Sequence, residues 1–232
     1  MDIRSARNVI SRDLRDFGFA ATLYDLSFRA ANHLLPCTVW NALTIDKPNS
    51  AYSSLPEDFQ GQLLDADKMR VYVSPENDLD NELIDRATDN GDHCMAIFDG
   101  NRLASYGWYS NQPTDLTEEL RLRFSGEHVY MYKGFTHNDY RGQRLHAIGM
   151  TLALQEFLRR GSRGIVSVVA SNNFSSLKSC YRMGYRDFGK IYAAKLAGRY
   201  LLHHSKGCAE YGFVVEPKPA TATRERTVVE SA

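Results

Sequence analysis

The sequence predicts a mixed α/β fold in which helices cover both faces of a mostly antiparallel central sheet. Two observations support this prediction. Two apolar runs at 94–98 and 103–109 flank the turn Asp99-Gly100-Asn101, which is typical of an antiparallel hairpin because Gly and Asn tolerate positive φ. Between residues 129 and 170, two strand patterns flank a helical pattern, which is typical of a right-handed βαβ crossover between parallel strands.

Helices are expected before the first strand. The later of two apolar helical patterns runs from Thr22 to Leu35 and ends before Pro36. We expect these helices to cover a face of the sheet, and we expect the first strand at 38–45, followed by a loop at 47–54. The earlier helical pattern is carried by five apolar residues: Ile3, Ala6, Ile10, Leu14 and Phe17.

The remaining elements follow from local patterns. Short helices are predicted at 60–70 and 80–88, and Asn90-Gly91 closes the second of them. Strands are predicted over 190–202 and 210–215, with a loop around 203–207. Residues 217–232 carry too little apolar surface to order themselves, so a disordered tail is expected there.

Composition excludes several classes of partner. Lys+Arg and Asp+Glu both number 28 in 232 residues, so no global basic field exists to attract nucleic acid or an anionic membrane. The four cysteines lie far apart, without CxxC spacing or histidine partners, which predicts reduced thiols and no metal site. The charged N-terminus and the lack of a long apolar run predict a cytoplasmic protein.

One turn carries chemical information. The segment Arg141-Gly142-Gln143-Arg144-Leu145-His146 lies between the strand ending near Phe135 and the following helix. A helix start leaves backbone N–H groups unpaired and carries partial positive charge, so it binds phosphate readily. The turn therefore indicates either a site for a phosphate-containing acyl donor or a βαβ unit with two solvated arginines.

The same residues resemble the GNAT N-acetyltransferase superfamily. Its acyl-coenzyme A turn reads (Arg/Gln)-x-x-Gly-x-(Gly/Ala), and here Arg144 and His146 stand where that pattern has small residues. These side chains would either crowd a diphosphate or bind it through charge-assisted hydrogen bonds. The resemblance spans about residues 93–192 and includes the closing segment NNFSSLKSCYRMGY, whose matching positions are Asn172, Ser176, Tyr181, Gly184 and Tyr185.

The resemblance implies a GNAT-like fold with a splayed parallel strand pair. One domain would span 1–216, with divergent substrate-side helices and a first strand in 1–92 and an acyl-donor-binding core in 93–216. It implies an acyl-CoA:amine N-acyltransferase, first of all an acetyltransferase, that uses acetyl-CoA or another acyl-CoA and acts on a small-molecule or protein amine. A donor on an acyl carrier protein and a catalytically silent, donor-binding regulator stay open as alternatives, and a homodimer is compatible with the sequence.

The resemblance also implies roles for individual residues. Tyr181 would be the general acid, and the alternative role for it is that of a core tyrosine. The Phe135 backbone N–H would stabilise the thioester carbonyl. The general base is left open among Glu127, His128, His137 and Asp139, with His137 as the named candidate. Cys180 could act as a nucleophile, although a structural thiol is the better expectation. The expected donor-binding residues are Phe135, Thr136, Arg141, Gly142, Gln143, Arg144, Leu145, His146, Asn172 and Ser176.

Overall fold

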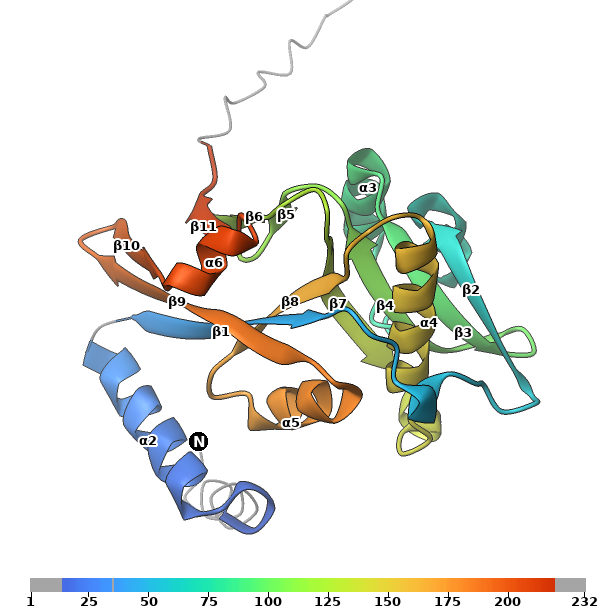
Figure 1. Cartoon of the computed structure of the whole chain (residues 1–232), viewed down its shortest axis with the longest axis horizontal. Helices are drawn as coiled ribbons and strands as arrows, with labels where there is room; N and C mark the ends of the chain where they lie inside the picture. The colour runs from blue at the N-terminus through green and yellow to red at the C-terminus, as the bar shows by residue number, and fades with distance from the viewer. Residues whose placement is uncertain (1–13, 35, 220–232) are drawn as a thin grey trace, which may run out of the picture.

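The computed structural model describes residues 14–34 and 36–219, and it is built around an eight-stranded sheet (Figure 1). The strand order is β10-β9-β1-β8-β7-β4-β3-β2, and β7 with β8 form a parallel pair while the other neighbours are antiparallel. The predicted mixed, mostly antiparallel sheet with a parallel pair is confirmed.

The bounds of the elements are as follows. The strands of the large sheet are β1 (Cys37–Ile45), β2 (Phe59–Asp65), β3 (His93–Asp99), β4 (Arg102–Ser110), β7 (Val129–Thr136), β8 (Ile165–Ala170), β9 (Arg186–Leu196) and β10 (Arg199–His204). A small second sheet holds β5 (Thr114–Asp115), β6 (Leu120–Arg123) and β11 (Val214–Pro217). The helices are α2 (Phe19–Leu34), α3 (Asn81–Asn90), α4 (Leu145–Arg159), α5 (Phe174–Met183) and α6 (Lys206–Glu210), with 3-10 turns η1 (Ser50–Tyr52), η2 (Ala66–Tyr72) and η3 (Asn138–Tyr140).

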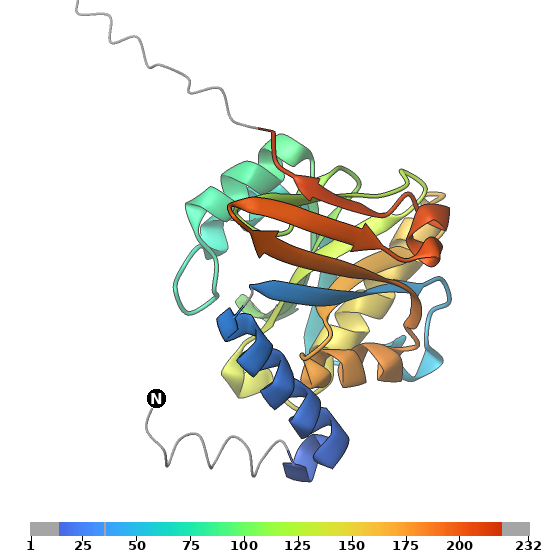
Figure 2. The ribbon, with the colours of Figure 1, turned by 90° about the vertical axis from the view of Figure 1, so that its left-hand side faces the viewer.

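Both faces of the large sheet are covered (Figures 1 and 2). On one face, α4 and α5 bury a core that includes Leu154 and Phe157. On the other face, η2 and α3 cover a core around Trp108, and the small sheet with α6 covers a separate core around Phe213. Two separate layers therefore share the face opposite α4.

The first strand of the chain lies inside the sheet. β1 pairs with β8 on one side and with β9 on the other, so Trp40 faces Ala170 and Ile191 across its two neighbours. Its predicted bounds are off by one residue at the start. Its central position was not predicted, because a strand's neighbours are set by contacts distant in sequence.

The helix α2 was expected to cover a face of the sheet, but it packs instead on the region around the start of α5. The Tyr24 hydroxyl lies 2.8 Å from Ser171 Oγ, and Asn172 Nδ2 donates to Asp25 Oδ1 at 3.0 Å. Figure 2 shows α2 beside α5. Phe19 on this helix is 73% exposed. Residues 14–17 are helical, and the other residues of the first predicted helix lie outside the described ones.

The predicted helix at 60–70 is wrong. Residues 59–65 form the edge strand β2, with Leu63 opposite Met95 of β3, and the 3-10 turn η2 follows. The backbone pairing that β3 offers outweighs the weak helical pattern, which also contains Gly61, a poor helix former. The helix predicted at 80–88 is confirmed: the Asp80 side chain accepts from Leu83 N, and Gly91 ends α3 with φ 71°.

The predicted single strand at 190–202 is wrong as well. Ala197 and Gly198 both have positive φ, 47° and 78°, and they turn the chain into the β9–β10 hairpin. His203 and His204, expected in a loop, belong to β10, and α6 follows at once. The last predicted strand lies at 214–217 instead of 210–215, so Pro217 is still ordered, and residues 220–232 of the predicted tail lie outside the described residues. Across the described part of the chain, no helix has the length and apolar character needed to cross a membrane.

Candidate functional site

The parallel strands β7 and β8 diverge and open a cleft. Their register holds from Val129, opposite Ile165, to Met131, opposite Ser167, and no pair is formed beyond that point in these two strands. The divergence opens a cleft of about 630 Å³. The splayed parallel pair that the resemblance implies is therefore present.

The cleft is lined by residues that belong to both faces of the sheet. Ser167, Val168 and Val169 of β8 all line it, although successive residues of a strand point to opposite faces. Val169 packs against the core under α4 and α5, and Val168 packs against the core under the small sheet. Residues on both sides of β8 therefore border the cleft.

A β-bulge lies where the two strands part. Trp108 of β4 faces Lys133 of β7, but the next residue, Tyr109, faces Met131, so Tyr132 is an extra residue without a register partner. A bulge disrupts the hydrogen-bond ladder locally. The backbone at Tyr132 is therefore the part of β7 best placed to interact with a ligand in the cleft.

Phe135, the predicted carbonyl-binding residue, lies three residues beyond the bulge. Its carbonyl oxygen accepts a hydrogen bond from Ser105 Oγ at 2.8 Å, and its ring stacks on Tyr106 with centroids 5.4 Å apart. Phe135 and Thr136 both line the cleft, as predicted for donor-binding residues.

The start of α4 faces the same cleft. Arg141 and Gly142 line it, and Gly142 has φ 86° with open space around its Cα. Among the described residues no side chain caps the N-terminus of α4, and its first turn holds no acidic residue. Unpaired N–H groups with a positive dipole end favour an anion here.

The two departures from the family turn behave differently. Arg144 adopts the left-handed conformation, φ 62° and ψ 13°, that glycine adopts easily, and its side chain is exposed and does not line the cleft. His146 does line the cleft, and a methyl group at Gly134 would overlap its ring. Burial lowers the pKa of His146, so this imidazole is neutral at pH 7.

Tyr181, the predicted general acid, is not among the residues that line the cleft, although it follows the lining residue Cys180 on α5. Its hydroxyl donates to Asp187 Oδ2 at 2.8 Å and accepts from Asn41 Nδ2 at 3.4 Å. Burial and the Asp187 hydrogen bond raise the pKa of Tyr181, so the phenol stays protonated at neutral pH. Sequence reasoning missed Asn41 and Asp187, although a polar residue inside the apolar strand β1 was a usable signal.

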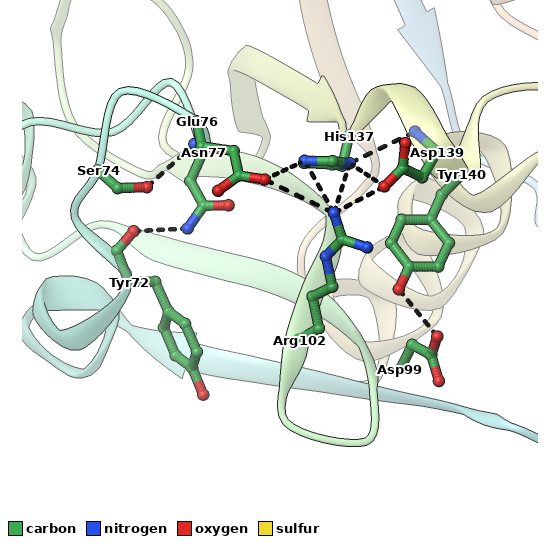
Figure 3. A network of polar contacts seen from close by, with 9 residues as sticks. All are labelled: Tyr72, Ser74, Glu76, Asn77, Asp99, Arg102, His137, Asp139 and Tyr140. Atoms are coloured by element: carbon green, nitrogen blue, oxygen red, sulfur yellow. Dashed lines mark hydrogen bonds and ion pairs between the residues drawn. The ribbon is translucent and has the colours of Figure 1, made fainter.

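His137, the named candidate base, is held away from the cleft in a polar network (Figure 3). Its Nε2 lies 2.9 Å from Glu76 Oε1, and Arg102 approaches both ring nitrogens while it donates to Asp139 at 2.8 Å. Tyr140 extends the network by donating to Asp99 at 2.8 Å. His137 and Asp139 therefore join the segment after β7 to neighbouring loops and do not face the cleft.

The other candidate bases also lie elsewhere. Glu127 pairs with Arg163 at 3.0 Å, and His128 is buried against Tyr211. None of these four candidates is among the residues that line the cleft.

The remaining predicted donor-binding residues divide into two groups. Ser176 lines the cleft from the first turn of α5. Asn172 donates to Asp25, Leu145 is buried in the core, and Gln143 is an exposed turn residue. The structure brings part of the predicted set together and leaves these three outside.

The Cys180 thiol lies in a buried environment. Burial raises the pKa of Cys180 to about 11, so its thiol is protonated at neutral pH and is a poor nucleophile. Among residues 14–34 and 36–219, no group of three or more His, Cys, Asp or Glu side chains is arranged to hold a metal ion.

Several solved structures are similar to this chain. The chain is similar to a tandem GNAT protein from the clavulanic acid biosynthesis pathway, with 13% identity, TM-score 0.50, and coverage of 78% of this chain and 58% of that one. A protein from Drosophila gives 13% identity, TM-score 0.48, and coverage of 79% and 59%. A GCN5-related N-acetyltransferase from Sphaerobacter thermophilus gives 11% identity and TM-score 0.47, with coverage of 77% of this chain and 55% of that one.

The chain thus spans less than two thirds of the length of these solved structures. Because their sequence identity to this chain is low, the similarity concerns the fold alone. No curated protein matches the chain. The model of the acetyltransferase (GNAT) family matches residues 49–185, which is more than half of the chain. This protein belongs to the GNAT acetyltransferase family.

Proposed function

We propose that the protein is an N-acyltransferase that moves an acyl group, in the first instance acetyl, from acyl-CoA directly to an amine. The observation that carries this proposal is the cleft between β7 and β8, which residues of both sheet faces line, with an uncapped helix start beside it. Such a cleft lets a thioester donor enter from one face and an amine approach it from the other.

The donor would bind along the α4 face. Arg141, the Gly142 backbone and the N–H groups of Leu145 and His146 would hold the diphosphate. The amide-rich pantetheine arm would run along β7 beyond Met131, where β8 no longer pairs, much as a peptide adds to a sheet edge. The His146 ring lies over Gly134 on this path, so it would turn aside or pack against the arm.

The chemistry needs a group for the carbonyl oxygen and an acid for the thiolate. The bulge at Tyr132 supports a backbone N–H there as the oxyanion donor, in place of the predicted Phe135. Tyr181 would protonate the departing thiolate, since its raised pKa keeps the proton available. Asp187 would orient this hydroxyl until the thiolate forms.

The test measures thiol release from acetyl-CoA with a panel of amines. Tyr181→Phe should lower kcat by about 100-fold, a usual contribution of a general acid, while the Kd for CoA stays within about threefold. Tyr192→Phe is the matched control, since Tyr192 is 43% exposed against 44% for Tyr181 and lies on β9 outside the cleft.

Two outcomes would replace the proposal. Binding of CoA without turnover on any amine would indicate a catalytically silent donor-binding domain. Turnover with an acyl carrier protein but not with acyl-CoA would keep the chemistry and change the donor.

A further inference from the structure

One ion pair lies beside β7, next to residues of that strand that line the cleft. Lys133 follows the bulge directly, and its Nζ lies 2.8 Å from Asp78 Oδ2 in the loop between η2 and α3. The Lys133 side chain is 29% exposed and that of Asp78 is 63% exposed, so solutes can reach the pair. Neither Lys133 nor Asp78 is itself among the residues that line the cleft, but Tyr132 and Phe135, which lie on either side of Lys133 in β7 and pack on the core under η2 and α3, do line it.

The loop holds Asp78 in an unusual conformation. Asp78 has φ 52°, in the left-handed region that non-glycine residues seldom adopt. The buried Tyr106 hydroxyl donates to the carbonyl oxygens of both Asn77 and Asp78 at 3.0 Å, and Asp78 N donates to Pro75 O at 3.1 Å. Asn77 Nδ2 also donates to Tyr72 O at 2.8 Å, a contact visible in Figure 3.

Such an arrangement fixes the position of one carboxylate. A strained residue persists where its surroundings over-determine it, and such residues concentrate at ligand clamps and active sites. The contacts of the loop place the Asp78 carboxylate beside β7, where that strand parts from β8. Its partner is an alkylammonium group on a four-carbon stem.

The neighbouring carboxylates are engaged differently. Glu76 contacts His137 and Arg102, both outside the cleft. Asp92 is buried and accepts from the Tyr132 hydroxyl at 2.9 Å. Asp80 caps α3 through Leu83 N. Asp78 is thus the acidic residue of this loop that pairs with the strand next to the bulge.

We propose that Asp78 binds the ammonium group of the acceptor and takes its proton, and that the acceptor is a primary alkyl amine. Lys133 occupies the place of that ammonium when no acceptor is bound. This inference rests on the proposed N-acyltransferase function and supplies the base that the candidates near β7 do not.

The proton balance is complete with the donor and acceptor already named. The Asp78 carboxylate takes one proton from R–NH3+, and the free amine attacks the thioester carbonyl carbon, forming the C–N bond. The C–S bond breaks, and the thiolate takes a proton from Tyr181. The amide nitrogen loses its second proton, which restores the Tyr181 phenol through solvent, and Asp78 releases its proton to water.

The experiment compares two nucleophiles at pH 7.5 with acetyl-CoA as donor. Cadaverine is a primary alkyl amine that is protonated at this pH, whereas methoxyamine is neutral and needs no base. For Asp78→Asn we expect kcat/KM to fall by about 100-fold with cadaverine and by less than about threefold with methoxyamine. Asn tolerates the left-handed conformation, so this variant should fold, and Asp78→Gly provides a second variant that does.

Two further variants sharpen the result. Lys133→Met removes the internal competitor and should lower KM for cadaverine several-fold. Glu82→Gln removes a carboxylate from the exposed first turn of α3, where it pairs with Arg86, and should leave both reactions unchanged.

The outcomes separate this inference from the proposed function. A wild-type protein that binds CoA but acylates neither nucleophile would overturn both. Transfer to methoxyamine without transfer to cadaverine would overturn the alkyl amine assignment. Wild-type transfer to cadaverine that Asp78→Asn leaves within threefold, or an equal loss with both nucleophiles, would overturn the role of Asp78 alone. If the KM for cadaverine does not fall in Lys133→Met, the proposal that Lys133 occupies the acceptor's ammonium site is wrong.

Discussion

The contact between α6 and β9 makes Gly207→Ala a demanding test of the packing. The Gly207 backbone lies directly on β9, and a Cβ at this position would overlap the Phe188 carbonyl oxygen and stand 2.8 Å from its carbonyl carbon. Both neighbours are backbone atoms, so no side-chain rotation relieves the overlap. The substitution must push α6 away from the strand.

The cost follows from the contacts that would break. Ser205 N donates to Lys190 O at 2.9 Å, and Lys190 N donates to Ser205 Oγ at 2.8 Å, each worth about 1 kcal/mol. Stacking of Phe188 on Tyr211, with centroids 4.0 Å apart, adds about 1 kcal/mol. We expect a loss of about 3 kcal/mol, which lowers the Tm of a protein of this size by about 6 to 12 °C.

The assay is thermal unfolding followed by circular dichroism, with urea unfolding as a second measure. Gly126→Ala is the control, because a Cβ there meets no atom within 4 Å, and it should change the free energy of unfolding by less than about 0.5 kcal/mol. A Gly207→Ala protein that melts within about 2 °C of wild type would show that α6 does not rest on β9 as described.

Three further predictions concern the site and its surroundings. Arg144→Gly should raise the Tm by about 2 °C, since the left-handed conformation costs a non-glycine residue about 1 kcal/mol; an unchanged Tm would contradict this. Cys180→Ala should keep kcat within about threefold, because a thiol with a pKa of about 11 is protonated, and an acylated wild-type enzyme in intact mass spectra would refute this. Burial raises the pKa of Asp92, so its charged form is disfavoured in the folded state. The stability of wild type relative to Asp92→Asn should therefore be greatest below pH 3.8 and should fall as pH rises through the folded pKa; urea unfolding that gives the opposite slope would contradict the assignment.

Elements marked by local chemistry were predictable from the sequence. The turn at Asp99-Gly100-Asn101 predicts the β3–β4 hairpin, and Asp80 with Gly91 marks both ends of α3. The βαβ unit and the turn at Arg141 follow from periodicity and helix-start chemistry. These signals act over a few residues, so they persist whatever the rest of the chain does.

Features that depend on distant partners were not predictable. β2 becomes a strand because β3 offers an edge, and the hairpin at Ala197-Gly198 was hidden in a continuous apolar pattern. The base candidates predicted from the sequence lie close to β7 along the chain, whereas Asp78 contacts Lys133 only in the folded protein. Asn41 meets Tyr181 for the same reason, since it comes from β1, far away in sequence.

The central position of β1 has a consequence for biosynthesis. Residues 37–45 leave the ribosome before their partners β8 (Ile165–Ala170) and β9 (Arg186–Leu196) are translated. Until then an apolar segment with two open edges has no native neighbour, and pairings so distant in sequence form slowly. Nascent chains stalled before residue 165 should therefore be prone to aggregation and depend on chaperones, and pausing after residue 196 should relieve that dependence.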